Sequence, residues 1–172
     1  LVREAAARNV RLRHFDVQLI GGWAMLNGML AEMETGEGKT LTATLAAATA
    51  ALSGSAVHII TVNDYLAERD AEAMEPLFRA LGVTVGCIKQ GMDPDSRRDA
   101  YRCDVAYCSN KEITFDYLRD RMVLRGKPRT VAMKVDALAG GGVRRRLLLR
   151  GLEFAIVDEA DLSEGVAKLA RN

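Results

Sequence analysis

Glu34-Thr35-Gly36-Glu37-Gly38-Lys39-Thr40, residues 34–40, is the strongest signal in this chain. Glycines at this spacing let backbone amides, including those of Gly36, Glu37 and Gly38, curl around phosphate oxygens without a Cβ clash. A helix that begins near Lys39 directs its positive dipole end toward the same phosphates. The pattern predicts a phosphate-binding loop (P-loop), in which Lys39 reaches the β- and γ-phosphates of ATP and the Thr40 hydroxyl binds Mg²⁺.

The residues just before the loop qualify this prediction. The general P-loop pattern begins with Gly, and this chain has Met33 there. Residues 35–40 match the helicase-type variant Thr-Gly-x-Gly-Lys-Thr, in which the first position is loose. The short apolar run from Met29 to Met33 predicts a strand that leads into the loop. The alternative is a glycine-rich turn that binds nothing.

On both sides of the loop, short apolar runs alternate with longer amphipathic stretches. The apolar runs predict strands at 57–62, 83–88, 105–108 and 154–157. The amphipathic stretches predict helices at 39–52, 64–81, 94–101 and 111–122, with an N-cap at Asn63 or Asp64, a helix-ending Gly82 and Pro94 in a first turn. This alternation predicts an α/β fold of the P-loop NTPase type, with a parallel sheet covered by helices on both faces.

An acidic pair follows the last predicted strand. Asp158-Glu159-Ala160-Asp161 comes directly after the apolar run 154–157. A strand that ends in Asp-Glu places both carboxylates at the carboxyl edge of the sheet, beside the phosphate loop. Asp158 is predicted to hold Mg²⁺ largely through water, and Glu159 to orient and deprotonate the attacking water. An acidic pair alone is a weak signal, but its partnership with Lys39 favours ATP hydrolysis.

The composition is that of a single globular domain. The chain has 172 residues, of which 49% are hydrophobic and 27% charged, and a net charge of +1, so nothing global indicates a nucleic-acid partner. No apolar run approaches the roughly 20 residues that span a bilayer, and no signal peptide opens the chain. Because position 1 is not Met, we expect the chain to be cut from a longer one. Three cysteines without close pairs favour buried, reduced thiols of the cytosol.

Residues 119–150 break the alternating pattern. They hold ten Lys/Arg and two acids, Asp120 and Asp136, for a net charge of 10 − 2 = +8. We interpret residues 123–150 as a basic surface insert. Runs of like charge are usually only solvated, and the alternative is docking on anionic lipid headgroups or on another protein.

Four long strings resemble the SecA family of protein-translocating ATPases. They are residues 12–22 (LRHFDVQLIGG), 31–41 (AEMETGEGKTL), 57–70 (VHIITVNDYLAERD) and 115–120 (FDYLRD). The resemblance covers most of residues 1–122 and again 151–161, and implies the first nucleotide-binding, DEAD-like motor domain over 1–161 with a RecA-like sheet. It implies ATP and Mg²⁺ as cofactors, and preprotein and a membrane translocation channel as partners. The implied location is the cytoplasmic face of the cytoplasmic membrane.

The resemblance also assigns roles to two residues outside the motifs. Gln18 matches the family's glutamine before the loop, which reads the adenine edge, and an amide offers both a donor and an acceptor for that task. The alternative for Gln18 is a solvent-exposed position on an amphipathic helix. Arg69 matches a residue near the nucleotide, and its alternative is a surface salt bridge with Glu68 or Asp70. The family hydrolyses ATP between two such domains, so a second motor domain is needed for catalysis and this piece alone is expected to be nearly inactive.

The chain departs from the family at three places. The basic insert at 123–150 is longer than usual, which indicates a divergent SecA-like paralogue. Residues 108–112 read Cys-Ser-Asn-Lys-Glu where the family has Gly-Thr-Asn-Asn-Glu, a stretch that couples nucleotide state to the rest of the motor. The tail at 162–172 resembles a piece of the later preprotein-binding domain. A nucleic-acid helicase fragment stays open as the rival, although residues 61–66 (TVNDYL) stand where a helicase would have Pro-Thr-Arg-Glu-Leu. A second rival is a non-catalytic interaction module.

Overall fold

The computed structural model describes residues 1–124 and 147–159. Most of the predicted basic insert (125–146) and the whole predicted tail (162–172) lie outside the described residues. The described elements, in chain order, are α1 (Val2–Asn9), α2 (Asp16–Leu26), α3 (Lys39–Leu52), β1 (Val57–Thr61), α4 (Asp64–Ala80), β2 (Val85–Cys87), α5 (Pro94–Arg102), β3 (Val105–Ser109), α6 (Asn110–Val123) and β4 (Phe154–Val157).

The four described strands form one parallel sheet in the order β2-β3-β1-β4. Val57 in β1 lies opposite Val105 in β3 and Phe154 in β4, so the three strands start in register. All five residues of β1 and of β3 are buried, as expected for central strands covered on both faces. The predicted parallel α/β sheet is therefore confirmed.

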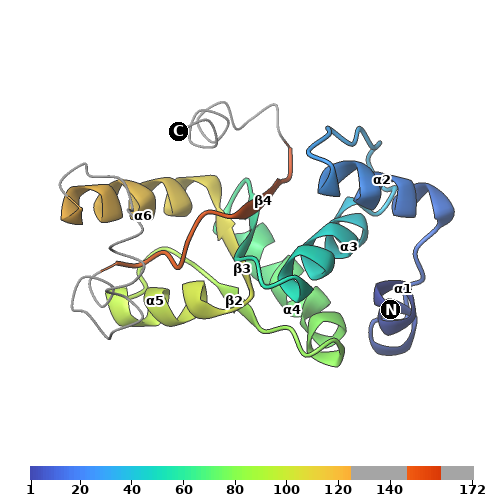
Figure 1. Ribbon diagram of the computed structural model, residues 1–172, viewed down its shortest axis with the longest axis horizontal. Helices are drawn as coiled ribbons and strands as arrows, with labels where there is room; N and C mark the ends of the chain where they lie inside the picture. The colour runs from blue at the N-terminus through green and yellow to red at the C-terminus, as the bar shows by residue number, and fades with distance from the viewer. Residues whose placement is uncertain (125–146, 160–172) are drawn as a thin grey trace.

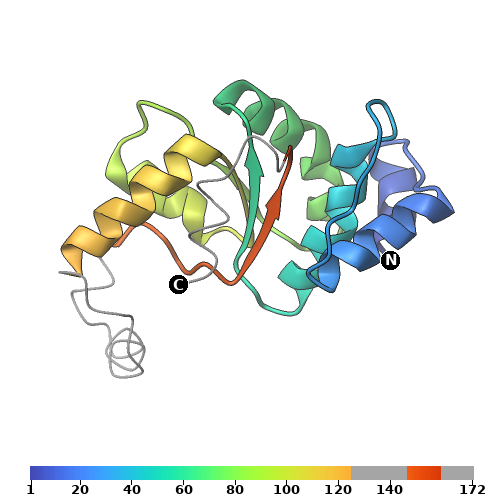
Figure 2. The same cartoon turned by 90° about the horizontal axis from the view of Figure 1, so that it is seen from above.

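Helices cover both faces of this sheet, as Figures 1 and 2 show. On one face, Ile59 and Tyr107 pack with α3, α4 and α1 in a core rich in alanine. On the other face, Ala106 and Cys108 pack with residues of α5 and α6 and with Leu148 and Leu149. α2 packs on α3 rather than on the sheet. The alanines of α3 let that helix approach the strands closely, which fixes the position of the phosphate loop at its start.

Most helix ends follow the signals in the sequence. Asn63 caps α4 by accepting a hydrogen bond from the Leu66 amide at 2.9 Å, and Pro94 begins α5 after the capping side chain of Asp93. Gly82 has a φ of +73° just beyond the end of α4. α1 and α2 stand outside the helices that the apolar periodicity predicts. None of the described helices is long and apolar enough to cross a membrane.

The strand predicted at 29–33 is wrong. These residues have no regular secondary structure, and the Leu30 side chain is largely exposed, at 82%. A strand needs a neighbour to satisfy its backbone hydrogen bonds. In the described residues, β4 is the edge of the sheet on the side of β1, and no described strand joins it to the run 29–33. The apolar side chains of Leu30, Ala31 and Met33 instead line a pocket, which is described below.

Of the three cysteines, only Cys108 is buried as predicted. Cys87 and Cys103 are partly exposed, since β2 is an edge strand and Cys103 caps the end of α5. Burial raises the pKa of the Cys87 thiol to about 11 and also raises that of Cys103. Thiols with raised pKa values react slowly at neutral pH.

Candidate nucleotide-binding site

The phosphate loop depends on two glycines. Gly36 and Gly38 have φ angles of +91° and +79°, a region that other residues adopt only with strain. Gly38 is the N-cap of α3, and a Cβ there would lie 2.7 Å from the Nε2 atom of Gln18. A turn closes the loop on itself, since the Glu34 amide donates to the Glu37 carboxylate at 2.9 Å and the Glu37 amide to the Glu34 carbonyl at 3.3 Å. The loop thus delivers its backbone to the N-terminus of a 14-residue helix, where anions bind favourably.

Lys39 and Thr40 are the first two residues of α3 and line a pocket of about 470 Å³. Lys39 is exposed and Thr40 partly buried. The pocket wall also includes the apolar side chains of Met25 and Ile156. Its size lies in the range of small-molecule sites, and its wall combines apolar side chains with charged and hydroxyl groups.

Asp158 and Glu159 line the same pocket, 119 residues after Lys39 (158 − 39). The Asp158 amide donates to the Ile60 carbonyl at 2.9 Å, which fixes the end of β4 against the end of β1. Glu159 follows with a φ of +56°, a left-handed conformation that is uncommon outside glycine. The parallel register therefore brings the two motifs to one edge of the sheet. Their chemical roles stay predictions.

Gln18 lies beside the loop but does not line the pocket. Its side chain is almost fully buried, so the solvent-exposed alternative is wrong. Its Nε2 donates to the Glu37 carbonyl at 2.7 Å, and its Oε1 accepts from the Phe15 amide at 2.9 Å. Gln18 thus joins the start of α2 to the phosphate loop, and the adenine-reading role stays a prediction.

Arg69 lies on α4 and forms a salt bridge with Asp70, the alternative that the sequence left open. Its side chain is 52% exposed and does not line the pocket. Asp70 is the functional candidate that sequence reasoning missed. It is buried, lines the pocket, and accepts from the Thr40 hydroxyl at 3.5 Å. The string at 57–70 ends in Arg-Asp, but nothing in that spacing shows that the carboxylate reaches α3.

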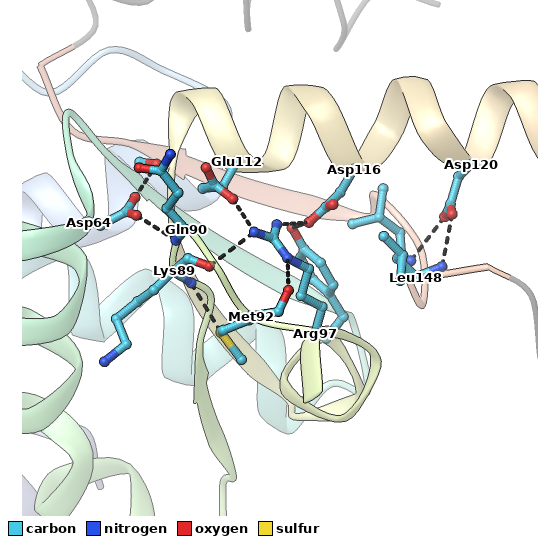
Figure 3. Close-up of polar contacts among 12 residues, drawn as sticks. Asp64, Lys89, Gln90, Met92, Arg97, Glu112, Asp116, Asp120 and Leu148 are labelled. Atoms are coloured by element: carbon cyan, nitrogen blue, oxygen red, sulfur yellow. Dashed lines mark hydrogen bonds and ion pairs between the residues drawn. The ribbon is translucent and has the colours of Figure 1, made fainter. Parts of the chain in front are cut away.

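Behind the sheet edge, a buried polar network holds α5 and α6 (Figure 3). Arg97 donates to the carboxylates of Glu112 and Asp116 and to the Lys89 carbonyl. Burial of the guanidinium acts to lower the pKa of Arg97, but its hydrogen bonds to Glu112 and then to Asp116 raise the pKa overall. One helix turn further, Asp120 accepts from the amides of Leu148 and Leu149. The string FDYLRD thus contributes its acids to structure, at a distance from the pocket.

The departure at 108–112 falls partly on this network. Ser109, where the family pattern has Thr, keeps the hydroxyl and donates to Asp64 at 2.5 Å, and Asp64 also accepts from the Gln90 amide (Figure 3). Cys108 is fully buried in the core and Lys111 is exposed. The end of β3 is therefore tied to the first residue of α4, the helix that carries Arg69 and Asp70.

The residues around the pocket fit a Mg²⁺–nucleotide ligand. Thr40, Asp158 and Glu159 offer hard oxygen donors, the kind that Mg²⁺ prefers, and Lys39 adds a positive charge for phosphate. Among residues 1–124 and 147–159, no group of three or more His, Cys, Asp or Glu could enclose a metal by itself. Mg²⁺ is usually held by one or two protein ligands together with phosphate oxygens and water.

Fold and site together define an α/β domain of the P-loop NTPase class. The chain belongs to the SecA DEAD-like domain family, whose model matches residues 1–162.

Curated relatives cover most of this chain. It is 58% identical over 160 residues to protein translocase subunit SecA 3 of Magnetococcus marinus, and 59% identical over 162 residues to protein translocase subunit SecA 2 of Bordetella avium. These matches cover 93% and 94% of this chain but 24% of each relative. A SecA subunit of Anaplasma phagocytophilum is 50% identical, with 16% of its length covered. The chain therefore spans a quarter or less of the length of these relatives.

A solved structure supports the fold. A hypothetical ATP-dependent RNA helicase from Sulfolobus tokodaii superposes with a TM-score of 0.57 at 20% sequence identity, and the match covers 98% of this chain and 44% of that one. At this level of identity the likeness concerns the fold alone.

Proposed function

We propose that this chain is the ATP-binding motor domain of a SecA-type translocase, which couples ATP hydrolysis to protein export. The observation that carries the proposal is the pocket that joins Lys39 and Thr40 of the phosphate loop to Asp158 and Glu159 of β4. Membership of the SecA DEAD-like domain family supports the translocase assignment. The named relatives are protein translocase subunits.

Each group has a role that its chemistry suits. The amides of residues 36–38 and the Lys39 ammonium bind the phosphates, and Gln18 and Arg69 take the nucleotide contacts that the family implies. Thr40 and Asp158 would hold Mg²⁺, the latter largely through water. Mg²⁺, when bound, neutralises charge that develops on the phosphates. Glu159 accepts a proton from water as the water oxygen bonds to the γ-phosphorus and the bond to the bridging oxygen breaks, which releases ADP.

The wider role belongs to the longer protein. The proposed partners are preprotein, a membrane translocation channel and anionic lipid at the cytoplasmic face of the membrane. A second motor domain closes over the γ-phosphate and supplies an arginine. Without that domain, hydrolysis by this chain alone is slow. The proposed domain covers residues 1–161, with the insert at 123–150 and the tail from 162 onward.

A binding titration tests the nucleotide site. We expect saturable binding of a fluorescent ATP analogue with Mg²⁺, and its loss in Lys39→Ala because the ammonium that binds the phosphates is removed. Lys111→Ala is the matched control, since Lys111 is an exposed lysine on α6. Binding that survives in Lys39→Ala, or that falls equally in the control, would contradict the proposal.

A chimera tests the translocase assignment against the helicase one. Residues 1–162 of this chain would replace the matching segment of the Bordetella avium relative, to which they are 59% identical. We expect ATP turnover to rise with anionic vesicles plus an unfolded preprotein and not with RNA. Stimulation by RNA alone would favour the helicase reading.

A further inference from the structure

Asp70 is a buried carboxylate at the candidate site to which no motif assigns a role. It lies on α4, and its side chain is 7% exposed. It lines the same pocket as Lys39, Thr40 and Asp158. A buried carboxylate is costly unless its oxygens accept hydrogen bonds, so the partners of Asp70 show what it is arranged to hold.

The two oxygens of Asp70 serve different partners. Oδ1 accepts from Arg69, at 2.8 Å from Nε and 2.7 Å from Nη2. Oδ2 accepts from the hydroxyl of Thr40 at 3.5 Å, a long contact of the kind that tightens when a ligand arrives. One carboxylate therefore joins Thr40, the second residue of α3, to Arg69 of α4.

The pairing with Arg69 is unusual for a helix. Adjacent residues of a helix do not face each other, yet Nε and Nη2 of Arg69 lie 2.8 and 2.7 Å from Oδ1 of Asp70. The hydrogen bond and then the charge of Asp70 raise the pKa of Arg69, and the charge of Asp158 adds to this.

We propose that Asp70 is a positioning residue of the nucleotide site, an inference that rests on the proposed function. A hydroxyl has one proton to donate and two lone pairs to offer. By accepting a hydrogen bond from the Thr40 hydroxyl, Asp70 leaves the lone pairs of Oγ1 free for Mg²⁺, as outer-shell groups do for metal ligands. Its other oxygen pairs with Arg69, whose side chain does not line the pocket.

The Mg²⁺ dependence of nucleotide binding tests this role. A fluorescent ATP analogue is titrated into wild type and Asp70→Asn at a series of Mg²⁺ concentrations and in EDTA. We expect the Mg²⁺ concentration at half-maximal enhancement to rise about 10–100-fold in Asp70→Asn, the usual effect of losing an outer-shell partner. Binding in EDTA should stay within about threefold, because the amide nearly keeps the volume of the side chain and no Mg²⁺ is present for Thr40 to hold.

Two further variants keep the test specific. Asp99→Asn is the matched control, because Asp99 is an exposed aspartate that pairs with Arg102 on α5. Thr40→Val removes the hydroxyl at nearly constant volume, and Asp70→Asn should add no further Mg²⁺ shift in that background.

The outcomes separate the inference from the proposed function. An unchanged Mg²⁺ requirement in Asp70→Asn, an equal loss of binding in EDTA, or additive shifts with Thr40→Val would overturn the positioning role while wild-type binding stands. Failure of the wild type to bind the analogue would instead refute the proposed function and this inference with it.

Discussion

At the scale of single residues, Gly38 carries two constraints at once. Its φ of +79° disfavours any side chain, and the space for a Cβ is taken by the amide of Gln18. We expect Gly38→Ala to cost about 1–2 kcal/mol of stability for the backbone conformation and about 1 kcal/mol for the displaced hydrogen bond. Nucleotide binding should be lost as well, since the loop shifts at the start of α3.

A second glycine separates these two effects. Gly54 has a φ of +91° and no heavy atom within 4 Å of a built Cβ. Gly54→Ala should therefore show the backbone cost alone and keep nucleotide binding. Thermal unfolding and a nucleotide titration of both variants would check this. Equal losses of stability and intact binding in both would mean that the contact between Gln18 and the loop is unimportant.

How far the site could be predicted also depends on single residues. Lys39, Thr40, Asp158 and Glu159 stand in motifs whose chemistry shows in the sequence itself. The role of Asp70 and the contact between Gln18 and the Glu37 carbonyl do not show in the sequence, because they depend on how α4 and α2 pack against the loop. The sequence left a pairing of Arg69 with Asp70 open beside one with Glu68, and the folded structure forms the pairing with Asp70.

At the scale of elements, one guanidinium holds α5 and α6 together. Arg97 is nearly buried and pairs with Glu112 and Asp116, of which Asp116 also accepts from the Tyr101 hydroxyl. We expect Arg97→Met to cost about 3–5 kcal/mol, because it leaves two buried carboxylates unpaired. Urea unfolding gives the measurement.

Arg102→Met is the control for that prediction. Arg102 sits on the same helix and pairs with Asp99 at 3.0 Å, but both side chains are exposed. Its loss should cost no more than about 1 kcal/mol. Adding Glu112→Gln and Asp116→Asn to Arg97→Met should restore part of the stability. A cost for Arg97→Met no larger than that of the control would show that the cluster does not join the helices.

Elements differed in how well the sequence predicted them. The helix at 39–52 and the strand at 154–157 were predicted to the residue, because the loop fixes one and an apolar run bounded by polar residues fixes the other. α2 was missed because it has two adjacent glycines and exposes Ile20 and Trp23, so it shows no polar face. The run 29–33 failed as a strand because strand formation depends on a neighbour that the local sequence does not reveal.

At the scale of the whole molecule, two buried histidines link stability to pH. Burial lowers the pKa of His58 in β1 to about 4, and burial also lowers that of His14. The unfolded chain binds these protons near pH 6.5, whereas the folded protein does not. The free energy of unfolding is therefore highest, as far as these two groups are concerned, above pH 6.5. It falls as the pH drops toward 4, by about 3 kcal/mol for His58.

Denaturant unfolding at pH 7.5, 6.0 and 5.0 tests this linkage. His58→Phe keeps an aromatic ring beside Tyr101 and removes the titrating group, so its stability should vary less over this range. The folded-state pKa values of Asp93 and Asp104 are lowered, which places their effect nearer pH 4. Equal pH slopes for wild type and His58→Phe would contradict the prediction.

The pairing of β1 with β4 sets an order of events during synthesis. Val57 lies opposite Phe154, and Lys39 precedes Asp158 by 119 residues. At roughly 5–20 residues per second, about 6–24 s pass between the two on the ribosome. A nascent chain can therefore fold its loop and central strands well before Asp158 and Glu159 exist to complete the pocket. Under the proposed function, Mg²⁺ held jointly by Thr40 and Asp158 can bind only after β4 has been translated.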